Sequence, residues 1–310
     1  MIFSKIKNYT IRFLRKILFL SKNISLPGFQ SVPIYNVVRI FYKGIINGDI
    51  NTQAASIAFN FFLATPPTII FLFTLIPYLP IENFQIELLS LVNNLLPHNA
   101  FSSINQTLED IITQQRGDLL SFSFFAALFF STNGIAAFIS AFNSSIHLKE
   151  TRSWIAQRLI AFVLVIIFSI LLLFAIVSIV FWGVIMNYLT QLNVFEDNYI
   201  LYLIVVTKWI IIIALFYFSI SFMYYLAPSE RLTFRFFSVG STFASIMSIL
   251  ASVIFSFYID NFGQYNKLYG SIGTIMVLLL WIYLNAWLIL LGFDLNESVI
   301  NAQKKKNLAN

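Results

Sequence analysis

The chain has 310 residues, of which 59% are hydrophobic and only 10% are charged, and its formal net charge is +6. A soluble domain carries about 25% charged residues, so this composition excludes a soluble protein, and its hydrophobicity excludes a disordered chain. The absence of cysteine excludes a disulfide-stapled domain and thiolate metal or redox chemistry. The composition therefore predicts an integral membrane protein.

A basic region, residues 1–53, precedes the first long apolar stretch. Its residues 2–20 interleave Lys and Arg with apolar side chains, a pattern typical of an amphipathic helix on a membrane surface. We expect this segment to set the topology through its positive charge, and a dedicated lipid-binding site is the alternative. Pro27, Gly28 and Pro33 then predict a turn.

Six stretches are long and apolar enough to cross a bilayer. A helical span needs about 20 residues, since the hydrocarbon core is about 30 Å thick and a helix rises about 1.5 Å per residue. The predicted spans are residues 54–79, 122–142, 159–185, 200–226, 236–259 and 272–293. The sequence thus predicts an all-α fold, a polytopic bundle of six transmembrane helices, in a membrane domain of residues 54–300.

The distribution of positive charge tests this count and gives an orientation. With the N-terminus in the cytoplasm, sixteen of the nineteen Lys and Arg residues fall in cytoplasmic segments, which include the tail 301–310. The positive-inside rule therefore places both termini in the cytoplasm. One span too many or too few would destroy the pattern, so the charges support the count of six.

The long outer loop, residues 80–121, is acidic. Its acidic residues are Glu82, Glu87, Glu109, Asp110 and Asp118. Within the loop, residues 86–96 have apolar side chains at helical spacing, and residues 101–112 predict a second short helix. We expect interfacial packing on the outer mouth of the bundle, with a functional lid as the alternative.

Two prolines interrupt the first span. Pro66 and Pro67 predict a kink or a break near the middle of the membrane, with Asn60 close by. Polar groups are costly inside a bilayer, so their placement carries information. Broken helices form substrate sites in many transporters, whereas a simple structural kink is the equally weighted alternative.

The second span carries Ser131, Thr132, Asn133 and Gly134 in a row. Four consecutive residues cover every face of a helix, so some of them must face protein or water rather than lipid. We expect Asn133 to hydrogen-bond a neighbouring helix, and a polar cavity is the alternative.

The fifth span has a stripe of serines at steps of three and four residues, which places them on one helix face. The stripe consists of Ser238, Ser241, Ser245, Ser248, Ser252 and Ser256. Small hydroxyl residues suit close helix packing and also suit the wall of a hydrated cavity. We favour a packing seam, and keep a single cavity formed with Asn133 and Pro66-Pro67 as the functional hypothesis.

A further motif lies in the outer turn between the last two spans, residues 261–270. It ends in Tyr265, Asn266, Lys267, Leu268, Tyr269 and Gly270. We expect a tight glycine turn closed by side-chain hydrogen bonds to the backbone. The alternative is that Lys267 meets an anionic headgroup or substrate outside the membrane.

The chain contains no recognisable catalytic motif. Its two histidines, His98 and His147, fall on opposite sides of the predicted membrane, and neither a Walker A loop nor a Gly-Xaa-Ser-Xaa-Gly motif occurs. No convergent acid–base set is visible. We therefore expect no enzymatic activity, no cofactor, no metal site and no nucleic-acid partner.

Three C-terminal motifs stand out: Tyr-Asn-Lys-Leu-Tyr-Gly at 265–270, Leu-Leu-Trp-Ile-Tyr at 279–283 and Gly-Phe-Asp-Leu-Asn at 292–296. With the loop motif of residues 143–158, they resemble the YihY/BrkB family of bacterial inner-membrane proteins. The resemblance implies a six-span bundle in the bacterial cytoplasmic membrane. Some members of that family bear the name ribonuclease BN, but this chain lacks the metal ligands or acid–base pair that RNA cleavage requires.

Two functions from different classes follow. The first is a transporter-like or lipid-handling membrane protein of unknown substrate, whose ligands are membrane lipids or a small molecule. The second is a structural or envelope-assembly protein that binds other envelope proteins through the acidic loop 80–121 and the turn 261–270. A ribonuclease is disfavoured, and the sequence gives no indication of the oligomeric state.

Overall fold

The computed structural model describes residues 25, 28–29, 32–47, 49–78, 109–144, 151–191, 198–229, 237–262 and 271–309. These residues are almost entirely helical and contain no strand. The predicted amphipathic segment 2–20, the outer-loop segment 86–96 and the turn residues 263–270 lie outside the described residues.

In the described part of the chain, six helices are long and apolar enough to cross a membrane. They are α3 (Ile50–Leu75, followed by the 3-10 turn Ile76–Tyr78), α6 (Gly117–Asn143), α7 (Trp154–Gln191), α8 (Asn198–Leu226), α9 (Val239–Phe262) and α11 (Ser271–Ala309). Each contains most of one predicted span in chain order, so the all-α bundle of six transmembrane helices is confirmed. A shorter helix, α2 (Ile34–Asn47), precedes α3.

The outward faces of these helices are apolar. Phe122, Phe125 and Leu172 are all more than 60% exposed, and Ile and Val side chains stand beside them. Such a surface would aggregate in water, but in a bilayer it faces acyl chains, while the helix satisfies its own backbone groups. The exposed apolar surface is therefore what a multi-pass membrane protein requires.

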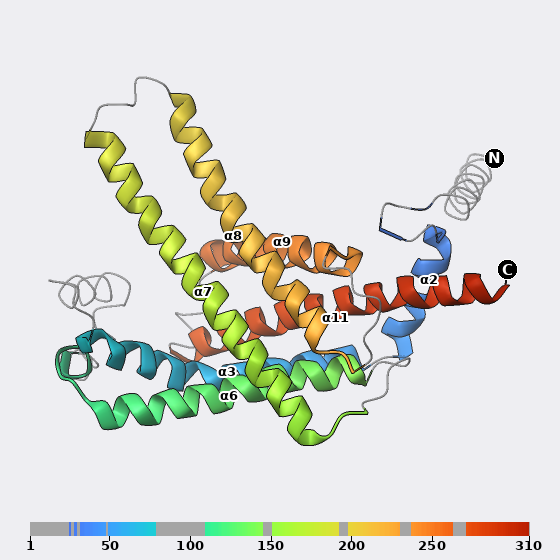
Figure 1. The fold of residues 1–310 in the computed structure, drawn as a ribbon, viewed down its shortest axis with the longest axis horizontal. Coiled ribbons are helices and arrows are strands. Elements are labelled where there is room, and N and C mark those ends of the chain that lie inside the picture. The colour runs from blue at the N-terminus through green and yellow to red at the C-terminus, as the bar shows by residue number, and fades with distance from the viewer. Residues whose placement is uncertain are drawn as a thin grey trace.

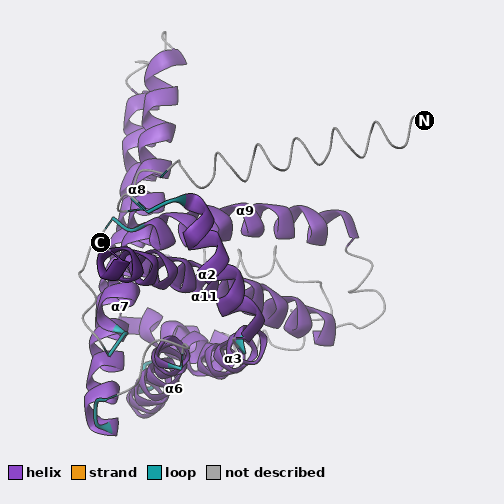
Figure 2. Cartoon of the chain, turned by 90° about the vertical axis from the view of Figure 1, so that its right-hand side faces the viewer, coloured by secondary structure: helices purple, strands orange, loops and turns teal. Residues whose placement is uncertain are grey.

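The helices pack in two groups. Figure 1 shows α3 and α6 side by side, and α11 packs between α3 and α9. α7 and α8 form a pair that crosses the other four helices steeply, and their far ends project beyond them (Figure 1, Figure 2). At the centre, the Phe142 ring stacks on Phe293 with 4.1 Å between ring centroids, which joins α6 to α11.

The end of α6 and the starts of α3 and α7 meet at one end of the bundle. We call this the inner end, because the charge pattern predicts that it faces the cytoplasm. Gln53 donates a hydrogen bond from Nε2 to Ser144 Oγ at 2.7 Å, joining α3 to the end of α6. Arg152, just before α7, donates to the Ala227 carbonyl oxygen at 2.7 Å, so the end of α8 lies here as well.

Asn143, the last residue of α6, ties α6 to the segment that follows α8. Its side chain is buried, and its Oδ1 accepts a hydrogen bond from the Ser229 N–H at 2.8 Å. Its Nδ2 donates more weakly to the Ala227 carbonyl, at 3.5 Å. Asn143, from the loop motif, therefore joins the end of α6 to the segment that follows α8.

Replacing Asn143 with alanine is expected to lower the free energy of unfolding by about 1–3 kcal/mol, because the Ser229 N–H loses its acceptor in a buried place. Thermal unfolding of the detergent-purified protein measures the effect. Asn36 is exposed on α2, so the Asn36→Ala variant should have the same melting temperature as the unaltered protein. Equal melting temperatures for both variants would contradict the expected role of Asn143.

α11 extends beyond the predicted last span. The prediction ended that span at residue 293, but the helix continues without interruption to Ala309. Its final part packs on α2 through a small apolar cluster of Val32, Val37, Val299 and Ala302. The helix thus runs past the predicted span, and α2 covers one side of the extension, a contact that hydropathy within the segment does not register.

α3 runs without a break through Pro66 and Pro67. The two prolines lack the N–H groups that would bond the carbonyls four residues back, at Phe62 and Leu63. Nearby hydroxyls bond other carbonyls of the same helix: Thr65 donates to Phe61 at 3.2 Å, and Thr68 donates to Ala64 at 2.7 Å. Of the predicted kink or break, a break does not occur, since the helix continues on both sides of the prolines.

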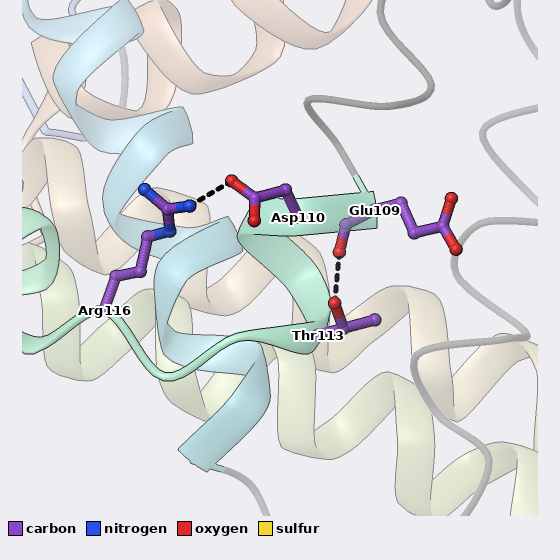
Figure 3. A network of polar contacts seen from close by, with 4 residues as sticks. All are labelled: Glu109, Asp110, Thr113 and Arg116. Atoms are coloured by element: carbon purple, nitrogen blue, oxygen red, sulfur yellow. Dashed lines mark hydrogen bonds and ion pairs between the residues drawn. The ribbon is translucent and has the colours of Figure 1, made fainter.

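At the opposite end of the bundle, a short helical turn of residues 109–113 leads into α6 (Figure 3). Arg116 donates to Asp110 Oδ2 at 2.5 Å, and Thr113 Oγ1 donates to the Glu109 carbonyl at 2.6 Å. Gln115 adds a bond to the Pro77 carbonyl at 3.2 Å, which fixes this turn to the end of α3. Two of the acidic residues predicted in the outer loop thus belong to this turn.

The helices α9 and α11 approach each other closely at two glycines. A Cβ atom built on Gly240 would lie 2.0 Å from the Gly292 carbonyl oxygen, and one built on Gly292 would lie 2.7 Å from the Gly240 carbonyl oxygen. Both positions therefore require glycine for steric reasons. The contact places residues 292–296, one of the family-like motifs, against the first turn of α9.

Candidate functional site

A polar cavity of about 400 Å³ opens between α3, α6 and the start of α7. About half of its lining surface is polar. Its lining residues are Gln53, Ser56, Asn60, Asn133, Ala136, Ala137, Ser140, Ala141, Ser144 and Arg158. We call this space the polar cavity.

The polar cavity exists because each of two apolar helices carries one polar stripe. Gln53, Ser56 and Asn60 follow one another at steps of three and four along α3, and so lie on one face. Asn133 and Ser140, seven residues apart, share a face of α6 in the same way. From Gln53 to Asn60 the cavity wall reaches about 10 Å along α3, at about 1.5 Å per residue.

Arg158, in the second turn of α7, is the one charged residue among the described residues that line the polar cavity. Its Nη1 donates a hydrogen bond to Asn133 Oδ1. The guanidinium carbon also lies 5.3 Å from the centroid of the Trp154 ring, a cation–π arrangement. The side chain is half-buried, so the charge stands at the edge of the membrane domain rather than in open solvent.

A second, apolar cavity of about 240 Å³ lies on the other side of the α3–α6 pair. Ile57 and Phe61 of α3 and Ile135 and Phe138 of α6 line it, together with residues of α7, α8 and α11. Its lining is almost entirely apolar. The pair of helices therefore separates a polar space from an apolar one.

The structure brings two of the predicted site residues together. Asn60 and Asn133 line the polar cavity from different helices, and Asn133 makes the expected interhelical hydrogen bond, to Arg158. Asn60 donates to the Ser56 carbonyl of its own helix at 2.8 Å. Pro66 and Pro67 line neither of the two cavities.

The serine stripe lies apart from both cavities. Ser241, Ser245 and Ser248 are at most 3% exposed on α9, which packs mainly on α11. Ser252 Oγ accepts a hydrogen bond from Trp281 Nε1 of α11 at 3.3 Å, while Ser256 is exposed. The buried serines therefore lie on the helix that packs mainly on α11.

The first two serines of the stripe cap α9. The Ser241 N–H donates to Ser238 Oγ at 3.1 Å, and the Ser238 N–H donates to Ser241 Oγ at 3.3 Å. This reciprocal pattern satisfies amides that have no partner within the helix. Ser241 Oγ also donates to Tyr217 Oη of α8 at 3.0 Å, so the cap joins α8 and α9.

The remaining predicted site residues are Tyr265, Asn266, Lys267, Tyr269 and Gly270, and all of them lie outside the described residues. The same holds for most of the acidic outer loop. Within the described ranges, no three His, Cys, Asp or Glu side chains gather closely enough to hold a metal ion.

Sequence reasoning missed most of the polar cavity. Gln53, Ser140 and Ser144 were not singled out, and Arg158 was noted only as part of a loop motif. The available signal was the helical spacing of polar residues inside apolar segments, such as Gln53, Ser56 and Asn60. The serine stripe of the fifth span shows the same spacing over more residues, and therefore gave the stronger pattern.

Comparison with known proteins agrees with the motifs. The family model described as Virulence factor BrkB matches residues 41–310. YfkH of Bacillus subtilis, named as ribonuclease-like, is 32% identical over 254 residues, which are 82% of this chain and 91% of that protein.

Two proteins named UPF0761 membrane protein match shorter stretches. The one from Idiomarina loihiensis is 32% identical over 113 residues, 36% of this chain and 40% of that protein. The one from Mannheimia succiniciproducens is 38% identical over 77 residues, 25% of this chain and 27% of that protein. No solved structure matches the chain. Since the family model covers most of its length, the chain belongs to the BrkB family of membrane proteins.

Proposed function

We propose that this protein is a transporter-like, lipid-handling membrane protein that takes an amphipathic molecule into its bundle from the inner end, without enzymatic chemistry. The observation that supports this proposal is the polar cavity, which extends about 10 Å along α3 in a chain that is mostly apolar. Polar lining costs free energy inside a membrane, and such residues commonly mark substrate pathways.

The two faces of the α3–α6 pair fit an amphipathic substrate. The polar cavity offers amide, hydroxyl and guanidinium groups to a headgroup. The apolar cavity and the lipid-facing sides of the helices suit hydrocarbon chains. In the predicted orientation, the substrate enters from the cytoplasmic leaflet.

Lipid movement in reconstituted vesicles tests the proposal. The vesicles contain a phospholipid with a fluorescent headgroup, and a membrane-impermeant quencher reports which leaflet holds it. We expect the protein to expose more of the labelled lipid than the outer-leaflet share seen in protein-free vesicles. Ser56→Leu with Ser140→Leu fills the polar cavity with apolar side chains and should return the signal to the protein-free level.

The matched control is Ser169→Leu with Ser178→Leu on α7. Both serines bond carbonyls of their own helix, at 2.8 and 2.6 Å, and neither lines a described cavity. This variant should move lipid as the unaltered protein does. No lipid movement by the unaltered protein would refute the proposal for phospholipids. Crosslinking of the loop 80–121 to another envelope protein would then support the envelope-assembly alternative.

A further inference from the structure

The polar cavity contains a positive charge that no acidic side chain of the described residues balances. Arg158 contacts the neutral amide of Asn133 and the ring of Trp154, and none of the described carboxylates lies within ion-pair distance of it. We propose that the polar cavity binds the phosphate group of an anionic ligand, with Arg158 holding its charge. The inference deepens the proposed function, because it concerns the same cavity and names the chemical class of the ligand.

The chemistry of the guanidinium favours a phosphate. Its five N–H donors lie in a rigid planar fork, and Asn133 takes a bond from one nitrogen of Arg158. The remaining donors match two oxygens of a phosphate in a bidentate arrangement. The guanidinium is half-buried beside neutral side chains, so a bound anion lowers the free energy of the site through charge-assisted hydrogen bonds.

Neutral donors surround the charge. Ser56 and Ser140 line the cavity from α3 and α6, and neither hydroxyl has a hydrogen-bond partner among the described residues. Among the described residues, no aspartate or glutamate belongs to the lining. This part of the cavity therefore presents one positive charge and free hydroxyls to an incoming oxyanion.

The level of Arg158 in the membrane fits the phosphate of a lipid. Arg158 lies four residues after Trp154, the first residue of α7, which is about 6 Å along the helix axis. Trp154 is 68% exposed at the inner end, and tryptophan is enriched at the level of lipid headgroups. A phosphodiester at this level is within reach of the cavity, and inorganic phosphate offers anionic oxygens of the same kind.

Ligand titrations of the full-length protein in neutral detergent test the inference. The probes are short-chain phosphatidylglycerol, inorganic phosphate, and short-chain diacylglycerol as the ligand without phosphate. We expect saturable binding of phosphatidylglycerol and none of diacylglycerol. Arg158→Gln should weaken phosphatidylglycerol binding on the order of tenfold or more, because it removes the charge. Arg39→Gln, which removes an exposed charge from α2, should bind as the unaltered protein does.

A second variant keeps the test decisive if Arg158→Gln does not fold. Asn133→Asp places a carboxylate of nearly the same shape against the guanidinium and gives Arg158 a permanent counter-ion. We expect this variant to elute as a folded species and to lose anion binding on the order of tenfold or more. A purely structural role for Arg158 would leave anion binding in Asn133→Asp unchanged, and that result would overturn the inference.

The outcomes separate the inference from the proposed function. Binding of phosphatidylglycerol but not inorganic phosphate supports a lipid source, and equal binding of both supports a free anion at the same site. If anion binding depends on Arg158 while vesicle lipids do not move, the phosphate site stands and the lipid-handling function fails. If lipids move but Arg158→Gln and Asn133→Asp bind anions as before, the phosphate site fails alone.

Discussion

Replacing Gly240 with alanine is expected to destabilise the folded protein by about 3 kcal/mol or more, at or above the usual range for overpacking. The new Cβ would lie 2.0 Å from the Gly292 carbonyl oxygen and 2.6 Å from Asn296 Cγ. A side chain that ends in a flexible group can move aside, but a backbone carbonyl can move only if α11 moves. The substitution therefore has to move α9 away from α11. That movement also disturbs the packing of the buried serines of α9.

The measurement is the melting temperature of the purified protein, followed by the fraction that remains monodisperse after heating. Gly44→Ala is the matched control, since a Cβ at Gly44 in α2 would meet nothing within 4 Å. There the exchange should stabilise by about 0.5–1 kcal/mol, because glycine in a helix interior costs conformational entropy. A Gly240→Ala protein that melts like the unaltered one would show that α9 and α11 do not cross this closely.

Replacing Asn296 with leucine is expected to cost about 1–3 kcal/mol, the cost of a buried polar group left without a partner. Asn296 Oδ1 accepts the Gly240 N–H at 2.7 Å, and its Nδ2 donates to Ser238 Oγ at 2.8 Å. The Gly240 amide lies in the first turn of α9, where no helical acceptor exists. A side chain of α11 thus completes the cap of α9.

Two variants on α11 bracket this effect. Asn285 bonds only the Trp281 carbonyl of its own helix, at 2.9 Å, so Asn285→Leu should change the melting temperature much less. Asn296→Asp keeps the acceptor for Gly240 and places a negative charge at a helix N-terminus, where it is favourable. It should be more stable than Asn296→Leu, and the reverse order would contradict the capping role.

The family-like motifs acquire structural roles from these contacts. Gly292 and Asn296, from the last motif, hold the first turn of α9. Asn143 and Arg152, from the loop motif, bond the segment that follows α8. Much of the resemblance that identified the family therefore concerns how the helices are joined, whereas the candidate site draws mainly on other residues.

The candidate site was only partly predictable from the sequence. Asn60 and Asn133 were predictable because a polar residue within an apolar span can be recognised from the sequence alone. The two asparagines share a cavity with Gln53 and Arg158. This arrangement depends on how α3, α6 and α7 are rotated about their axes. Rotation is set by contacts between segments far apart in the chain, such as the approach of Phe61 to Gly134, which hydropathy does not encode.

By itself, the sequence determined that this is a helical membrane protein with six spans, because span length and hydrophobicity are properties of single continuous segments. The orientation remains a prediction from charge. Only the tertiary structure decided that the serine stripe lies apart from both described cavities, that α11 continues along α2, and that a polar cavity carries the guanidinium of Arg158. These features depend on which helices meet and through which faces, and close packing decides that between segments distant in the chain.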